Sequence, residues 1–196
     1  MNKQRFEAFS DAVIAILITI MVLELRPPHV PELRALTEVV PTFLSYVLSF
    51  IYLGIYWNNH HHMLHATHKI TGGALWANLH LLFWLSLLPF ATAWMGENHF
   101  AATPTALYGV VLFGCAIAYT ILERVLIAAN GPQSELAKAV HHGFKEKISP
   151  FFYMAAIPLA FVNQYLSGAL LAAVALMWVI PDRRIERRLR GGTDER

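Results

Sequence analysis

Residues 5–25 read RFEAFSDAVIAILITIMVLEL, an apolar run with the carboxylate of Asp11 about one turn inside it. The hydrocarbon core of a bilayer is ~30 Å thick, and a helix needs roughly 20 apolar residues to cross it. Residues 6–25 therefore predict a transmembrane helix. A carboxylate inside a bilayer costs about 2.5–3.5 kcal/mol even on the most lenient insertion scale, so Asp11 indicates a functional or structural site.

The rest of the chain also has the composition of a membrane protein. Of its 196 residues, 56% are apolar and 14% are charged. A soluble domain typically carries about 25% charged residues, so this composition argues against a water-soluble enzyme. Five further apolar runs lie at residues 41–60, 74–95, 104–128, 148–163 and 165–180. The last two are short for a span, and the polar pair Asn163-Gln164 predicts a tight hairpin between them.

These runs predict an all-α membrane protein with six transmembrane helices in one domain, residues 1–181. If the spans alternate from an inner amino terminus, only Arg26 and Arg34 of the 15 lysines and arginines lie outside. Basic residues accumulate on the cytosolic side of membrane proteins, so both termini are expected in the cytosol. The basic tail, residues 182–196, predicts contact with anionic lipid rather than with nucleic acid.

The first run has two distinct faces when it is drawn as a helix. At about 100° per residue, Phe9, Ile16 and Leu23 fall along one line, and Thr19 and Ile20 flank that line. Asp11 lies about 140° from Ile16 and should contact neighbouring helices. Periodicity alone leaves two interpretations of the stripe open, ordinary helix packing and the lining of a pore.

A short motif in the same run resembles a known family. Arg5, Phe9, Ser10 and Asp11, followed by an apolar helix with a threonine, are similar to the signature of the transmembrane protein 175 potassium channels. The sequences WNNHH at 57–61 and LLPF at 87–90 also fit, as does a single six-helix repeat of the bacterial form.

The resemblance implies a homotetramer in the cell (inner) membrane, with the first helix of each copy lining a central pore that conducts K⁺ and needs no cofactor. It places hydrophobic layers at Ile16, at Thr19 or Ile20, and at Leu23. It also implies that hydrogen bonds from the Arg5–Asp11 motif tie the first span to the second and third.

The implied pore differs from that of ordinary potassium channels, because the chain contains no TVGYG sequence. A narrow apolar ring forces ions to shed water, which costs K⁺ less than Na⁺, and Thr19 hydroxyls replace some of the lost ligands. We expect modest selectivity, with Ile16 as the main gate. Glu24 is expected at the outer mouth, where it either draws cations in or is an ordinary carboxylate among lipid headgroups.

Histidines offer the leading alternatives to a channel. His60, His61 and three further histidines gather after residue 59, where His60 or His61 is expected to complete the network of Arg5 and Asp11. Residues of this type also suit a proton-coupled or proton-conducting transporter. A membrane metalloenzyme needs several such clusters, and only one is dense here. We therefore expect no metal site, no catalytic residues and no enzyme.

Overall fold

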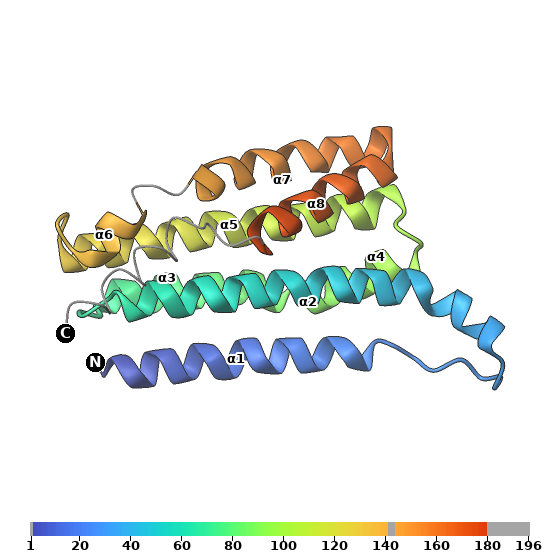
Figure 1. Cartoon of the computed structure of the whole chain (residues 1–196), viewed down its shortest axis with the longest axis horizontal. Coiled ribbons are helices and arrows are strands. Elements are labelled where there is room, and N and C mark those ends of the chain that lie inside the picture. The colour runs from blue at the N-terminus through green and yellow to red at the C-terminus, as the bar shows by residue number, and fades with distance from the viewer. Residues whose placement is uncertain (1, 141–143, 180–196) are drawn as a thin grey trace, which may run out of the picture.

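The structure is a computed structural model and describes residues 2–140 and 144–179. Within these residues the chain forms long helices that run side by side (Figure 1). In chain order the elements are α1 (Lys3–Leu23), the short 3-10 turn η1 (Leu33–Ala35), α2 (Leu36–His65), α3 (Gly72–Ser86), α4 (Leu88–Glu97), α5 (Ala102–Asn130), α6 (Glu135–Val140), α7 (Phe144–Val162) and α8 (Gln164–Val179).

Four segments of the described residues are long and apolar enough to cross a membrane. They are Lys3–Leu23, Leu33–His65, Gly72–Glu97 and Ala102–Asn130. α7 and α8 are shorter or carry more charge, and they pack against each other as a hairpin. The chain is therefore an all-helical membrane protein.

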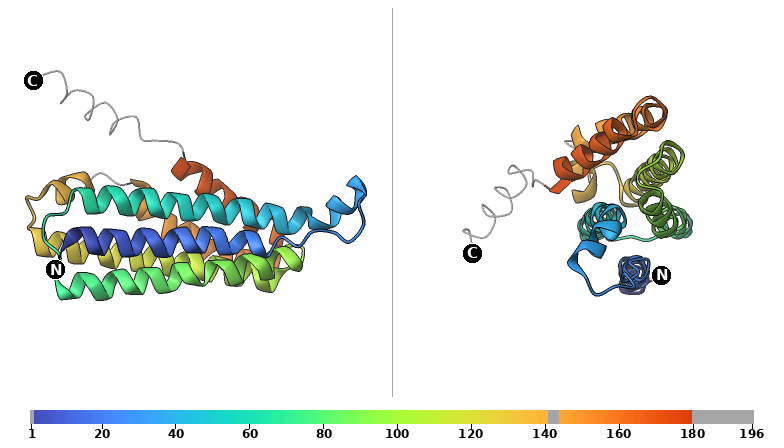
Figure 2. Two further views of the ribbon diagram at one scale, coloured as in Figure 1. Left: turned by 90° about the horizontal axis from the view of Figure 1, so that it is seen from below. Right: turned by 90° about the vertical axis from the view of Figure 1, so that its right-hand side faces the viewer.

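The core of the bundle forms around α5, which packs against α3, α4 and α7. α2 packs against α4 and α8, and α1 contacts α2, α3 and α4. Seen end-on, α1 lies at the edge of the bundle (Figure 2). This position leaves one side of α1 uncovered in the single chain.

The third apolar run is broken near its middle. α3 ends at Ser86 and α4 begins at Leu88. Pro89 has no backbone N–H to donate to the carbonyl four residues before it, so a continuous α-helix cannot pass through this point without a defect. A proline inside an apolar run predicts a kink, and the structure has a break at the single residue Leu87 between two helices.

The last hairpin turns at Asn163, whose side chain caps α8. Its Oδ1 accepts hydrogen bonds from the backbone N–H groups of Tyr165 at 3.0 Å and Leu166 at 3.1 Å. An asparagine cap supplies acceptors for N–H groups that have no partner inside the helix. The chain therefore reverses direction between the runs 148–163 and 165–180.

Two features differ from the sequence analysis. α2 extends beyond the expected 41–60 to Leu36 and His65, because Pro41 lies near its start and the histidines after residue 60 continue the helix. The short helix α6 was not expected. Residue 180 of the sixth run and the tail 182–196 lie outside the described residues.

Candidate ion-conduction helix and its supporting network

The two faces of α1 have opposite environments. Phe9, Ile16 and Leu23 are 51%, 55% and 76% exposed in the single chain. The opposite face is buried against the bundle, through Phe6, Ser10, Ile14, Leu17 and Met21. The stripe recognised from periodicity is thus the uncovered side of α1.

Thr19 presents its oxygen on this uncovered side. Its Oγ1 donates a hydrogen bond to the backbone carbonyl of Ile16 at 2.9 Å. The hydroxyl proton is used within the helix, so the lone pairs of the oxygen remain available to accept from water or to contact a cation.

Ile20 and Glu24 lie at the border between α1 and α4. Both line a groove that also includes Phe90 and Trp94 of α4. Ile20 is 41% exposed, and Glu24 is the residue directly after the last turn of α1. A carboxylate at this end of α1 lies next to the uncovered stripe.

A buried chain of hydrogen bonds joins α2 and α3 to α1. His60 Nε2 and Asn78 Oδ1 lie 2.8 Å apart, and Asn78 Nδ2 donates to Ser10 Oγ at 2.9 Å. Ser10 donates in turn to the backbone carbonyl of Phe6 at 3.0 Å. Because Asn78 Oδ1 only accepts, His60 donates from Nε2, and its buried Nδ1 has no partner among the described residues. This network connects α2 to α3 and α3 to α1.

The acidic residues of α1 bind α2. Trp57 Nε1 donates to Asp11 Oδ1 at 3.1 Å, and His61 Nδ1 lies 3.2 Å from Glu7 Oε1. Asp11 thus meets a donor on a neighbouring helix, but the donor is an indole. Arg5 is exposed, and none of the described contacts joins it to Asp11.

The histidines at the end of α2 stack on one another. The rings of His61 and His65 are 6.4 Å apart at 25°. Over residues 2–140 and 144–179, no group of three or more histidine, cysteine, aspartate or glutamate side chains is arranged to hold a metal ion.

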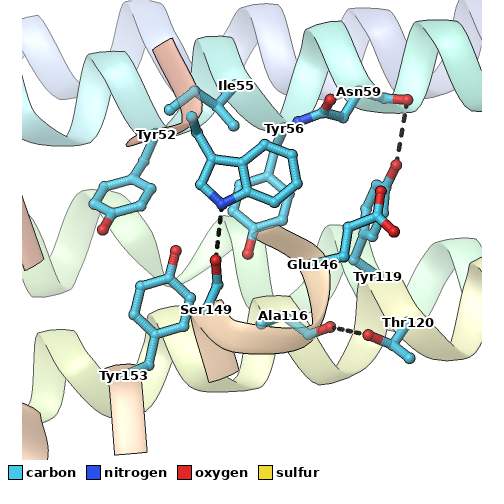
Figure 3. A pocket seen from close by; sticks show the side chains of 11 residues that line it. Tyr52, Ile55, Tyr56, Asn59, Ala116, Tyr119, Thr120, Glu146, Ser149 and Tyr153 are labelled. Carbon is cyan, nitrogen blue, oxygen red and sulfur yellow. Dashed lines mark hydrogen bonds between the residues drawn. The ribbon is translucent and has the colours of Figure 1, made fainter. Parts of the chain in front are cut away.

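A separate cavity of about 40 Å³ lies within the bundle, between α2, α5, α7 and α8 (Figure 3). It is lined by Tyr52, Ile55, Tyr56, Asn59, Ala116, Tyr119, Thr120, Glu146, Ser149, Tyr153 and Trp178. Glu146 is the one acidic residue of this lining, and its side chain is partly buried. No residue of α1 contributes to this cavity.

The first part of the chain matches a known family. Residues 5–89 match the model described as endosomal/lysosomal potassium channel TMEM175. Over 190 residues the chain is 54% identical to a potassium channel from Chryseobacterium sp., and the match covers 97% of this chain and 99% of that protein. The chain belongs to the TMEM175 family.

Other TMEM175 relatives agree in fold. The crystal structure of a lysosomal potassium-selective channel TMEM175 homolog from Chamaesiphon minutus matches with a TM-score of 0.76 at 25% identity, covering 90% of this chain and 96% of that one. The human endosomal/lysosomal proton channel TMEM175 is 29% identical over an alignment of 188 positions, and the match covers 88% of this chain and 37% of the human protein. The resemblance first seen at residues 5–11 is confirmed, and these relatives are named as channels rather than enzymes.

Sequence reasoning missed two partners of the motif, Asn78 and Trp57. Asn78 is a lone amide in the apolar run 74–95, which is a signal for a buried polar contact in a membrane helix. Trp57 lies in the sequence WNNHH near the end of a predicted span, where tryptophans commonly form the aromatic belt of a membrane protein. Neither residue could be paired with α1 before the helices were placed in space.

Proposed function

We propose that the chain is a potassium-selective cation channel in which four copies bring their α1 helices together around a central pore. The uncovered apolar stripe of Phe9, Ile16 and Leu23 carries this proposal. An uncovered apolar face of a membrane helix meets either lipid or another protein surface. Its coincidence with the layer positions expected for TMEM175 channels favours the face between copies.

Selectivity in such a pore arises from partial dehydration. Four Ile16 side chains form an apolar ring, where an ion must lose part of its water shell. K⁺ holds water less tightly than Na⁺, so it passes at lower cost. The Thr19 oxygens, one turn further along, replace some of the water molecules that K⁺ has lost. Ile20 and Leu23 continue the narrow lining. The same ring closes the pore when it dewets.

The network behind α1 sets the direction in which the stripe points. The Ser10–Asn78–His60 chain and the Asp11–Trp57 hydrogen bond lie on the sides of α1 away from Ile16. We propose that they fix the rotation of α1 about its own axis, with Arg5, Phe9 and His61 at the same end of the helix. Glu24 is proposed to attract cations at the opposite end.

Six spans with both termini in the cytosol complete the proposed topology. In this arrangement α7 and α8 are the fifth and sixth spans, and the basic residues gather on the side of the amino terminus. The chain is proposed to reside in the cell (inner) membrane, where its basic tail contacts anionic lipid.

Proton conduction through the same pore is a second candidate function. The human relative is named a proton channel. In this chain the His61–Glu7 pair lies 3.2 Å apart beside the start of α1 and offers two groups that exchange protons. Flux measurements must therefore include a pH-sensitive dye.

Reconstituted protein in planar bilayers with a K⁺/Na⁺ gradient tests the proposal. The reversal potential is expected to favour K⁺. Ile16→Asn should raise the conductance severalfold and move the reversal potential toward equal permeability, because an amide ring hydrates ions of both kinds. Val22→Asn is the matched control: Val22 is also exposed on α1 but lies about 120° around the helix from Ile16. An unchanged reversal potential in Ile16→Asn contradicts the assignment.

A further inference from the structure

The cavity between α2, α5, α7 and α8 has aromatic walls. The rings of Tyr52 and Tyr153 are 6.1 Å apart at 62°, and those of Tyr56 and Tyr119 are also 6.1 Å apart at 62°. Trp178 also lines the cavity, and its Nε1 donates to Ser149 Oγ at 2.8 Å. Inclined aromatic faces around one space are the arrangement that attracts cations to ring surfaces.

Several polar side chains of this cavity form no hydrogen bond among the described residues: the Glu146 carboxylate, the Tyr56 hydroxyl and the Asn59 amide. Tyr119 and Thr120 use their hydroxyl protons, because Tyr119 donates to the backbone carbonyl of Asn59 at 3.3 Å and Thr120 donates to its own helix. The free acceptors therefore point to a ligand that donates hydrogen bonds.

The charge of the lining indicates that the ligand is positively charged. Glu146 is the one acidic residue among the lining residues, which include no lysine, arginine or histidine. A partly buried carboxylate is costly, the neighbouring Lys147 does not line the cavity, and a cation inside the cavity lowers this cost. The volume of about 40 Å³ corresponds to about three water molecules, which is the size of a group with three heavy atoms.

We propose that this cavity binds a small primary ammonium group, held by the Glu146 carboxylate and the Tyr56 hydroxyl and enclosed by the rings of the aromatic walls. The three N–H donors of an ammonium group match these acceptors. Such a ligand bridges the α7–α8 hairpin to α2 and α5. The site is separate from the proposed pore, because no residue of α1 lines it.

Isothermal titration of the full-length protein in maltoside detergent tests the site, with ethylammonium as the probe and ethanol as its neutral counterpart. The buffer is sodium phosphate at pH 8, where the ethylammonium probe is charged, and Tris is avoided because it is itself an amine. We expect saturable binding of one ethylammonium per chain and no binding of ethanol.

Two variants address the roles of the acceptors. Glu146→Gln keeps the shape of the side chain and should weaken ethylammonium binding about tenfold, the loss expected for a charge-assisted hydrogen bond. Tyr56→Phe keeps the ring and should produce a smaller loss. Glu135→Gln, which removes an exposed carboxylate in α6, is the matched control and should leave binding unchanged.

The lipid around the protein distinguishes two sources of the ammonium group, a lipid headgroup and a soluble amine. In nanodiscs that contain phosphatidylethanolamine, a lipid headgroup in the cavity lowers the apparent affinity for ethylammonium relative to phosphatidylcholine nanodiscs. Equal affinity in both assigns the site to a soluble amine. Absence of saturable binding, or equal binding by the wild type and Glu146→Gln, overturns the proposal. Ion flux is not measured in this assay, so failure of the pore proposal leaves its outcome unaffected.

Discussion

Replacement of Asn78 by leucine removes the central link between α3, α2 and α1. Asn78 is 2% exposed and bonds both His60 and Ser10. Leucine keeps the branch point at Cγ but is larger than asparagine, so the change removes the hydrogen bonds and adds bulk at a buried position. His60 loses its last side-chain partner, since its Nδ1 has none among the described residues.

The loss of stability in Asn78→Leu depends on the hydrogen bonds that His60 and Ser10 keep. A buried polar group without a hydrogen bond costs about 1–3 kcal/mol, and His60 incurs this cost in full. Ser10 still donates to the carbonyl of Phe6, so it loses only about 1 kcal/mol. The sum is about 2–4 kcal/mol, which for a chain of this size corresponds to a fall in Tm of roughly 5–10 °C.

Two measurements on the purified protein check this expectation. Thermal unfolding in detergent, followed by size-exclusion chromatography, measures the Tm of Asn78→Leu beside that of Asn58→Leu, an exposed asparagine of α2. Bilayer recordings measure the preference for K⁺, which should fall in Asn78→Leu because α1 is no longer fixed in rotation. A Tm within about 1–2 °C of the wild-type value refutes the energetic reasoning. A lower Tm with unchanged selectivity refutes the proposed link to the pore.

Two further predictions concern helix packing and the pore mouth. Gly114→Ala should destabilise the protein by about 1–3 kcal/mol, because the added β-carbon overlaps the indole of Trp84. Gly54→Ala should stabilise the protein by about 0.5–1 kcal/mol, because the added β-carbon meets open space. Thermal unfolding that ranks the two variants in the opposite order contradicts this packing. Glu24→Gln should lower K⁺ conductance about twofold relative to the wild type at 10 mM salt and leave it unchanged at 1 M salt, where charges are screened. If the variant and the wild type conduct equally at 10 mM salt as well, Glu24 does not attract cations to the pore mouth.

Much of the fold is predictable because it depends on local properties of the chain. The apolar run 6–25 corresponds to α1, since length and hydropathy alone determine whether a segment is stable as a helix in lipid. The helix break before Pro89 and the turn at Asn163 follow from one missing N–H group and from one capping side chain. α6 was missed because six polar and apolar residues in mixed order give no clear period.

The candidate site also has a part that the sequence predicts and a part that it does not. The alignment of Phe9, Ile16 and Leu23 is a property of any helix with 3.6 residues per turn, so it is visible in the sequence. The partner of Asp11 is not visible. Charge suggests Arg5, yet the structure supplies Trp57, because the packing of α1 on α2 brings that indole within 3.1 Å.

The sequence by itself determined a helical membrane protein, the breaks in its helices and the apolar stripe of α1, since each depends on residues within a few turns of one another. Only the tertiary structure decided that this stripe is the uncovered face, that Ser10 reaches His60 through Asn78, and that tyrosines of three helices enclose a cavity beside Glu146. These are contacts between residues tens of positions apart. They arise from the packing of helices against one another, which hydropathy and periodicity within a single helix do not determine.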